Sequence, residues 1–326
     1  MRNVVVTFDA RPESREAILD VLSSVANVHY LTDLDSTDRS DVLSHADALI
    51  SLNPAGDLAE GELDLISGAK LVQLIAAGVD FIPFQQLPDN LLVASNAGGW
   101  SEPIAEHAVA MALSAAKRLS IRQAALAKGD FNQNGLNLTL KGGVFGVVGY
   151  GGIGRATGRL MRGLGMKIHA VNRSGCTEDE VDFVGNSSSL HSVLERADVV
   201  LVSTPLTKST EGLIGESELS AMKETAILIN VARGEIIDEG ALYKHLTLNP
   251  NFTACIDAWW VEPVRHGEFR MDYPFLELPN VIGSPHNSFS IPGAFFNAVG
   301  QAAENVKRLL DGGTVENIVP TGDMFR

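Results

Sequence analysis

The sequence predicts an α/β protein made of two doubly wound domains, each with a parallel β-sheet. Short apolar runs alternate with longer amphipathic stretches along most of the chain, which is the pattern of parallel strands joined by crossover helices. A glycine-rich turn at residues 149–154 closes one apolar run and opens a helical pattern, so a second sheet begins near it. At 326 residues the chain is long enough to bury two cores.

The part of the chain before residue 100 predicts the first sheet. Two stretches with helical periodicity, residues 13–26 and 59–67, lie between apolar runs. An acidic run at residues 33–41 is expected to be a solvated loop. The expected strands cover residues 4–8, 28–31, 46–51 and 71–75.

The rest of the chain predicts a second, larger sheet. A helical pattern rich in alanine and leucine covers residues 103–127, and a last amphipathic helix follows residues 291–293 and ends near residue 310. Residues 317–320 can then return to the first domain. We therefore expect residues 99–289 to form one domain, inserted between segments 1–98 and 290–326 of the other. The six expected strands of the inserted domain begin at Val144, Lys167, Val199, Ala226, Phe252 and Val281.

Composition and charge exclude several classes of partner. The net charge of −15 argues against binding to nucleic acid or to an anionic membrane, because both need clustered lysine and arginine. No apolar run approaches the length of a membrane span, and the start of the chain lacks a signal-peptide pattern. The two cysteines, Cys176 and Cys255, have no metal-ligand spacing, and Cys255 lies in an apolar run. We expect a cytoplasmic protein that holds no metal.

The glycine-rich turn has the spacing of a dinucleotide-binding site. Gly149 begins the turn, Gly151 lets a pyrophosphate approach the backbone, and Gly154 lets the next helix pack closely on the strand. The N–H groups at the start of that helix attract the anion. The residues expected to contact the cofactor here are Tyr150, Gly151, Gly152 and Ile153.

The end of the following strand favours NADP(H) over NAD(H). A carboxylate at this place usually binds the ribose 2′-hydroxyl, whereas this chain has Asn172, Arg173 and Ser174. The guanidinium of Arg173 can grip a 2′-phosphate, and the two neutral side chains can add hydrogen bonds. The alternative is that Arg173 is an ordinary solvated loop arginine.

Three polar residues follow three different strands of the inserted domain. Arg233, Glu262 and His286 each come after an apolar run, at the strand ends where open α/β sheets collect their ligands. Any one of them alone would be unremarkable. Together an arginine, a carboxylate and a histidine can converge beside a bound cofactor.

These blocks together resemble the D-2-hydroxyacid dehydrogenases. The resemblance lies in the glycine turn, the Arg233 segment, Glu262-Pro263 and Ser284-Pro285-His286, and it extends to residues 76–80 and 204–207. It covers essentially the whole chain, with the blocks in the family's order. It implies a Rossmann nucleotide domain inserted in a flavodoxin-like substrate domain, closure of the two domains around the ligand, and a homodimer formed around the long helix.

The resemblance also implies a role for each site residue. Arg233 would bind the substrate's carboxylate, and His286, paired with Glu262, would be the acid–base for the keto oxygen, because an imidazole exchanges protons near neutral pH. Backbone N–H groups at Ala77 and Gly78 would complete the carboxylate pocket. The remaining cofactor contacts that the resemblance implies are Thr204, Pro205, Val231, Ala232 and Asp257.

The chain departs from the family's pattern in three places. Trp100 stands where the family often has asparagine, so an indole either narrows the pocket or caps it. Ser203 replaces a histidine that many members carry. The pair Trp259-Trp260 is unusual, and one indole forms either a pocket wall or packing at an interface.

Two functions from different classes remain open. The favoured one is an NADP-dependent reductase of small 2-ketoacids, such as glyoxylate or hydroxypyruvate, within the D-2-hydroxyacid dehydrogenases. The alternative is a protein that senses NAD(P)(H), like the transcriptional co-repressors of this fold. An enzyme that resembles phosphite dehydrogenase also remains possible, because those enzymes keep the glutamate.

Overall fold

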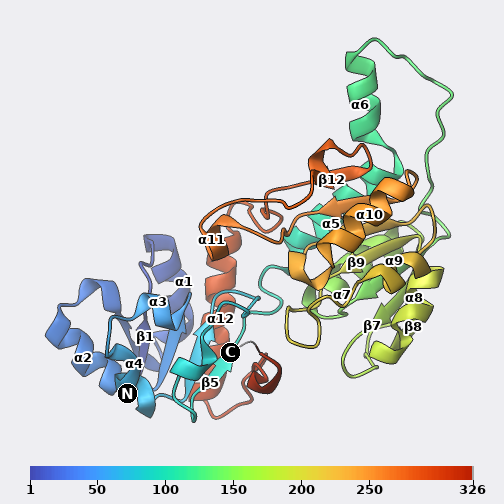
Figure 1. Cartoon of the computed structure of the whole chain (residues 1–326). Helices are drawn as coiled ribbons and strands as arrows, with labels where there is room; N and C mark the ends of the chain where they lie inside the picture. Colours follow the sequence, from blue (N-terminus) through green and yellow to red (C-terminus); the bar gives the residue numbers. More distant parts are fainter. Residues whose placement is uncertain (325–326) are drawn as a thin grey trace. The chain divides into compact units, whose positions relative to one another are not determined.

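The computed structural model describes residues 1–324, so the last two residues of the expected segment 290–326 lie outside the described residues. The chain forms two compact units (Figure 1). The first contains Met1–Trp100 and the segment from Ile291 onward, and the second contains Ser101–Ser290. Each unit is built around one parallel sheet with helices on both faces.

The first unit has a five-stranded sheet in the order β2-β1-β3-β4-β5, with all strands parallel. Val4 and Val6 pack with α1 (Pro12–Leu22) and α12 (Ala294–Leu310) on one face, whereas Val5 packs with α2 (Ser36–Ser44) on the other. The four expected strands are confirmed within a few residues, and β5 is additional. The strands are β1 (Arg2–Val6), β2 (Ala26–Tyr30), β3 (Ala48–Ser51), β4 (Leu71–Leu74) and β5 (Leu92–Ala94).

The acidic run at residues 33–41 is not a loop, and this expectation was wrong. Asp35 caps α2 because its carboxylate accepts hydrogen bonds from the N–H groups of Thr37 and Asp38. Leu43 is the buried residue of this helix, so the run carries little apolar periodicity. Two further short helices follow, α3 (Pro54–Asp57) and α4 (Glu62–Leu65).

The second unit has a seven-stranded parallel sheet in the order β12-β11-β10-β9-β6-β7-β8. The six expected strands are confirmed, and β8 is a seventh, formed by three half-buried residues. Chain order reverses between the neighbours β6 and β9, and ligands bind at this switch point in open α/β sheets. The strands are β6 (Val144–Val148), β7 (Lys167–Val171), β8 (Phe183–Gly185), β9 (Val199–Val202), β10 (Ile227–Asn230), β11 (Thr253–Ile256) and β12 (Val281–Gly283).

Helices cover both faces of this second sheet. A Cβ at Gly146 would lie 3.2 Å from Val193 of α8, and one at Gly154 of α7 would lie 2.8 Å from Val147. Because neighbouring strand residues point to opposite faces, α7 and α8 lie on opposite sides of β6. The helices of the unit that flank the sheet are α5 (Ser101–Ala116), α7 (Gly152–Gly163), α8 (Leu190–Arg196), α9 (Glu216–Ala221) and α10 (Glu239–Leu248).

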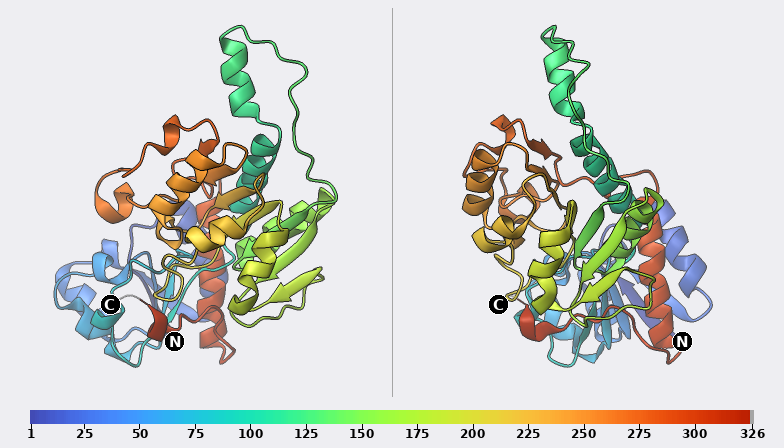
Figure 2. Two further views of the ribbon diagram at one scale, coloured as in Figure 1. Left: turned by 45° about the vertical axis from the view of Figure 1, so that its right-hand side comes forward. Right: turned by 90° about the vertical axis from the view of Figure 1, so that its right-hand side faces the viewer.

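The helix expected over residues 103–127 is broken into α5 and α6 (Leu119–Ala127), so the expectation of one long helix was wrong. Arg118 adopts a left-handed backbone, with φ of 52°, and turns the chain. No residue of α6 is buried. Figure 2 shows α6 standing away from the rest of its unit, with a long return loop beside it. Its exposed apolar side chains, together with those of the loop, are Leu119, Leu126, Phe131, Leu136 and Leu138.

The return of residues 317–320 to the first unit is confirmed. Ile318 forms an antiparallel bridge with Ala94, and the N–H of Val319 donates to the carbonyl of Val93. Beneath this segment the buried side chain of Asn305 donates to Gln73 Oε1 at 2.6 Å and to the carbonyl of Glu316 at 2.9 Å. Within residues 1–324, no helix combines the length and apolarity that crossing a membrane requires.

Candidate active site

The glycine turn joins β6 to α7 at the switch point of the second sheet. Gly149 has φ of +98°, and a Cβ there would lie 2.4 Å from the backbone nitrogen of Thr204. A Cβ at Gly154 would lie 2.6 Å from the carbonyl oxygen of Gly149. Both positions therefore require glycine for close packing, as the sequence predicts. Ser203, which follows β9, donates from Oγ to the carbonyl of Gly149 at 2.9 Å and ties the two strand ends together.

The same turn leaves room for an anionic ligand. A Cβ at Gly151 would meet no heavy atom within 4 Å, in contrast to the crowded Gly149 and Gly154. Gly151 is also the N-cap of α7, and no side chain caps this helix. An open backbone at an uncapped helix start is the geometry that a dinucleotide pyrophosphate requires. The residues present therefore fit the expected cofactor.

Tyr150 lies in the turn with its ring buried against α7. A Cβ at Gly158 would lie 3.4 Å from its Cε2 atom. Burial and the neighbouring carboxylate of Asp179 raise the pKa of the Tyr150 hydroxyl. Arg155 of α7 holds Asp179 through two hydrogen bonds of 2.6 and 2.7 Å, which lower the pKa of that carboxyl. The tyrosine side chain is therefore part of the support beneath the turn.

The loop after β7 presents Arg173 at the surface. Asn172 folds this loop: its amide donates to the carbonyl of Cys176 at 2.8 Å, and its oxygen accepts from the N–H of Gly175 at 2.7 Å. Ser174 also bonds to Asn172 and to Cys176. Arg173 is exposed and forms no ion pair with another residue of the described chain. The two neutral side chains thus shape the loop, and the guanidinium remains accessible.

Arg233, Glu262 and His286 follow the neighbouring strands β10, β11 and β12. Nδ1 of His286 lies 2.7 Å from Oε2 and 2.9 Å from Oε1 of Glu262. The structure also brings the Arg233 segment close, because a Cβ at Gly234 would lie 2.4 Å from the backbone of Trp259 and Trp260. Arg233 donates from Nη1 to its neighbouring carbonyl at Ala232, at 2.7 Å.

The Glu262 carboxylate is nearly enclosed, with 9% of its side chain exposed. Burial alone would raise the pKa of the carboxyl. The hydrogen bond and charge of His286, the N–H of Trp259 at 2.7 Å and the charge of Arg233 outweigh burial, so the pKa lies below its ordinary value. Glu262 therefore remains ionised beside the imidazole at neutral pH.

Asp257, expected to contact the cofactor together with Val231 and Ala232, is completely buried. Its carboxylate accepts from Ser284 Oγ at 2.5 Å and from the N–H groups of Asn287 and Ser288. Each of these contacts goes to the loop that carries His286. His107 of α5 reaches the same cluster, with Nε2 3.0 Å from Ser284 Oγ. His107 could not be predicted from the sequence, because a single histidine within a helix gives no signal of a partner far along the chain.

In the first unit, Ala77 and Gly78 lie in the half-buried loop after β4. The carbonyl of Ile75, at the start of this loop, accepts hydrogen bonds from Trp100 Nε1 at 2.9 Å and from Asn96 at 3.2 Å. The indole of Trp100 also contacts Phe295 at 6.3 Å between ring centroids. Trp100 therefore both braces the loop and packs on an aromatic neighbour.

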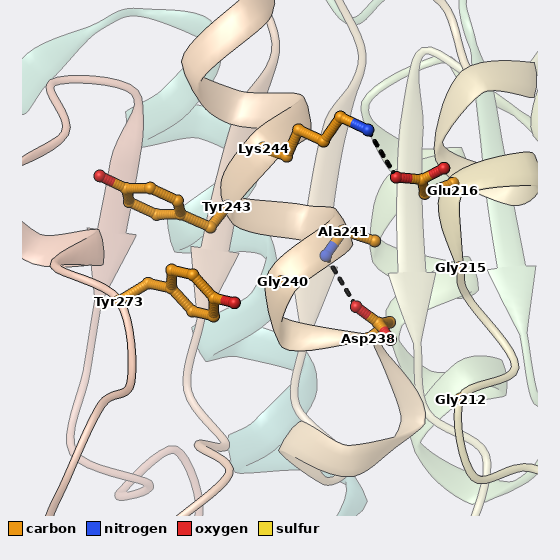
Figure 3. Close-up of a pocket in the computed structure, with 9 residues that line it drawn as sticks. All are labelled: Gly212, Gly215, Glu216, Asp238, Gly240, Ala241, Tyr243, Lys244 and Tyr273. Atoms are coloured by element: carbon orange, nitrogen blue, oxygen red, sulfur yellow. Dashed lines mark hydrogen bonds and ion pairs between the residues drawn. The ribbon is translucent and has the colours of Figure 1, made fainter.

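A pocket of about 490 Å³ lies elsewhere in the second unit (Figure 3). Tyr243 and Tyr273 form one side of it, and Lys244 pairs with Glu216 on the other at 2.7 Å. None of Arg233, Glu262 and His286 lines this pocket. Its position sets it apart from the candidate active site.

Residues 109–288, more than half of the chain, match the family model of the D-isomer specific 2-hydroxyacid dehydrogenase, NAD binding domain. The chain belongs to this family. The resemblance and the fold class predicted from the sequence are confirmed. As in other members of the D-2-hydroxyacid dehydrogenase family, the unit that carries the glycine turn is thus an NAD-binding domain.

Individual relatives agree with this assignment. The glyoxylate reductase of Aeropyrum pernix is 30% identical over 332 residues, which cover 97% of this chain and 95% of that protein. The D-3-phosphoglycerate dehydrogenase of Methanocaldococcus jannaschii is 28% identical over 310 residues, covering 93% of this chain and 57% of that protein. The chain spans about half the length of the D-3-phosphoglycerate dehydrogenases that it matches. In structure, it is similar to the D-isomer specific 2-hydroxyacid dehydrogenase of Lactobacillus delbrueckii ssp. bulgaricus in its NAD-complexed form, with a TM-score of 0.77, 26% identity, and 98% and 100% of the two chains covered.

Proposed function

We propose that the protein is an NADP(H)-dependent oxidoreductase that interconverts a small D-2-hydroxy acid and its 2-ketoacid. The observation that carries this proposal is the contact of His286 with Glu262 at the ends of β12 and β11, beside Arg233. A bound nicotinamide cofactor supplies or accepts the hydride. The protein's own residues then have two tasks, which are to bind a carboxylate and to move one proton.

Proton transfer falls to Nε2 of His286. Nδ1 is engaged by the ionised Glu262, so Nε2 is the ring nitrogen that can donate to a keto oxygen. In the oxidative direction the same nitrogen takes the proton back from the hydroxyl group. Arg233 binds the substrate's carboxylate, for which its planar fork of donors is suited. The backbone N–H groups of Ala77 and Gly78 are proposed as further donors to the substrate's carboxylate.

The preference for NADP(H) over NAD(H) rests on Arg173. No carboxylate occupies the loop formed by Asn172, Arg173 and Ser174, and the guanidinium is exposed there. An arginine at this place binds a 2′-phosphate through charge-assisted hydrogen bonds. The remaining cofactor contacts proposed for this chain are Tyr150, Gly151, Gly152, Ile153, Thr204, Pro205, Val231, Ala232 and Asp257.

We also propose an oligomeric state and a location for the protein. The leucines of α6 and of its return loop are exposed, and a second copy of the chain would cover them, so we propose a homodimer. Both cysteines are free thiols, which agrees with a cytoplasmic location. Sedimentation of the protein and of a variant with Leu119→Glu and Leu136→Glu tests the dimer.

Initial rates of NADPH and NADH oxidation against glyoxylate, hydroxypyruvate, pyruvate and phenylpyruvate test the activity. We expect turnover with NADPH for the small acids. Arg233→Ala should abolish this turnover while NADPH still binds, because the arginine acts on the substrate. His286→Ala should lower kcat by about 100-fold or more, the usual contribution of a general acid. Tight NADPH binding without turnover of any ketoacid would favour a nucleotide-sensing protein instead.

A further inference from the structure

Trp259 donates one hydrogen bond to Glu262 and another to the loop that carries His286. Its backbone N–H donates to Glu262 Oε1 at 2.7 Å, the same oxygen that lies 2.9 Å from His286 Nδ1. Its indole Nε1 donates to the carbonyl of Ser284 at 2.8 Å, two residues before His286. A single residue thus contacts the carboxylate directly and the histidine through its loop.

The loop that carries His286 needs such restraint. His286 has φ of +49°, a left-handed conformation that is costly for a residue with a side chain and persists only where the surroundings hold it. β12 ends at Gly283, and the next residue, Ser284, forms three hydrogen bonds in addition to the contact of its hydroxyl with His107. Its N–H donates to the carbonyl of Ile256 at 2.9 Å, its hydroxyl donates to Asp257, and its carbonyl accepts from the indole of Trp259.

The indole can aim its N–H in only one direction. Trp259 is 3% exposed, and a Cβ at Gly283 would lie 2.9 Å from its Cζ2 atom, so the strand end packs directly on the ring. Phe269 lies edge-on to the same ring, at 5.6 Å and 85°. These contacts fix the side-chain rotamer and with it the hydrogen bond to Ser284.

We propose that Trp259 is a positioning residue for the acid–base pair, acting through its indole N–H on the backbone of the His286 loop. This inference rests on the proposed function, because it assigns the purpose of the contact to proton transfer by His286. Loss of the indole N–H would free the Ser284 carbonyl, and the imidazole would sample orientations away from Glu262. The chemical step would slow, whereas the binding of the ketoacid and the cofactor would change little.

The neighbouring tryptophan offers a matched control. Trp260 also donates from Nε1 to a backbone carbonyl, that of Ile237, at 2.7 Å, and its ring stacks on Phe275 at 5.2 Å and 12°. The change Trp260→Phe therefore removes the same kind of hydrogen bond from the adjacent residue. It leaves the bond to Ser284 in place.

The experiment compares Trp259→Phe with Trp260→Phe in steady-state kinetics. Trp259→Phe should lower kcat by about five- to tenfold, the effect of one lost hydrogen bond, with KM for the ketoacid within about twofold of wild type. Trp260→Phe should keep the wild-type kcat. Equal losses in both variants, or an unchanged kcat in Trp259→Phe, would overturn the proposal.

Hydrogen exchange gives a second readout that needs no activity. The amides of Ser284 and of residues 286–288 should exchange about fivefold faster in Trp259→Phe than in wild type or Trp260→Phe, because their loop has lost a restraint. If wild type turns over no ketoacid, the proposed function fails, and the exchange rates alone then decide whether Trp259 restrains this loop. Identical exchange in all three proteins would refute that restraint.

Discussion

Nδ1 of His286 lies 2.7 Å from Oε2 and 2.9 Å from Oε1 of Glu262, so one nitrogen of the imidazole is fully engaged by a carboxylate. The carboxylate is 9% exposed, and the imidazole is 27% exposed. Of the two partners, the histidine is thus the one that a ligand can reach. This asymmetry makes Glu262 the anchor of the pair and His286 the group proposed to meet the substrate.

Replacing Glu262 should change stability in a pH-dependent way. Because the folded-state pKa of Glu262 lies below its ordinary value of 4.5, its contribution is complete above that value and is lost as pH falls through the folded-state pKa. Glu262→Gln should therefore lower the free energy of unfolding at pH 7 by about 1–3 kcal/mol. The difference from wild type should shrink below about pH 4.5. Urea unfolding at a series of pH values measures it, and a difference that stays constant down to pH 3 would contradict the assignment.

Arg173→Ala should discriminate between the two cofactors. If the guanidinium binds a 2′-phosphate, its loss should raise KM for NADPH by about 10- to 100-fold, which corresponds to one charge-assisted interaction. KM for NADH should stay within about twofold, since NADH lacks that phosphate. Arg159→Ala, which removes an equal charge from an exposed pair with Glu102, is the control. Equal changes for NADPH and NADH would argue that Arg173 does not contact the 2′-phosphate.

Alanine substitutions at two glycines of the turn should affect different properties, one cofactor binding and the other stability. Gly151→Ala should leave thermal stability nearly unchanged, because its Cβ would meet no atom within 4 Å, but should weaken NADPH binding. Gly149→Ala should destabilise the protein by about 1–3 kcal/mol or more, because its φ is +98° and its Cβ would meet the backbone of Thr204. Thermal unfolding and fluorescence titration with NADPH separate the two effects. Wild-type cofactor affinity in Gly151→Ala would place the pyrophosphate elsewhere.

The two cysteines should differ in reactivity. Cys176 is exposed in the Arg173 loop, whereas Cys255 is completely buried in β11, and burial raises the pKa of its thiol to about 12. Ellman's reagent should therefore titrate one thiol in the native protein and a second only after unfolding. In Cys176→Ser the native reaction should disappear. Two fast thiols in the native protein would mean that β11 opens readily.

Much of the fold follows from local patterns, and the failures have identifiable physical causes. Apolar runs predict the buried strands, because a parallel sheet is covered on both faces. β5 and β8 were not predicted, and each has only three residues, although β12 has the same length and was predicted. α2 escapes because a single buried leucine gives no periodicity. The break between α5 and α6 depends on the left-handed backbone of Arg118, a residue type that does not favour that conformation.

The residues of the candidate site can be predicted from the sequence only in part. Arg233, Glu262 and His286 can be selected because each follows an apolar run, and adjacent strands in a parallel sheet end at the same edge. The contributions of Trp259 and His107 cannot be read in this way. Trp259 bonds to Glu262 and to Ser284, and His107 bonds to Ser284. Each of these bonds depends on the orientation that a side chain or carbonyl has once the sheet has formed. The roles of all these residues remain predictions.

The hydrogen bonds of Asn305 have a consequence for the order in which the two units fold during synthesis. Gln73, completely buried in β4, has its amide oxygen satisfied by a residue more than two hundred positions later. The same face of the sheet also depends on the late helix α12 for its apolar cover. Residues 1–100 therefore emerge from the ribosome long before the residues that complete their core. The second unit is one continuous segment, so all of its core residues emerge together. The unit that is synthesised first should therefore be the last to complete its fold.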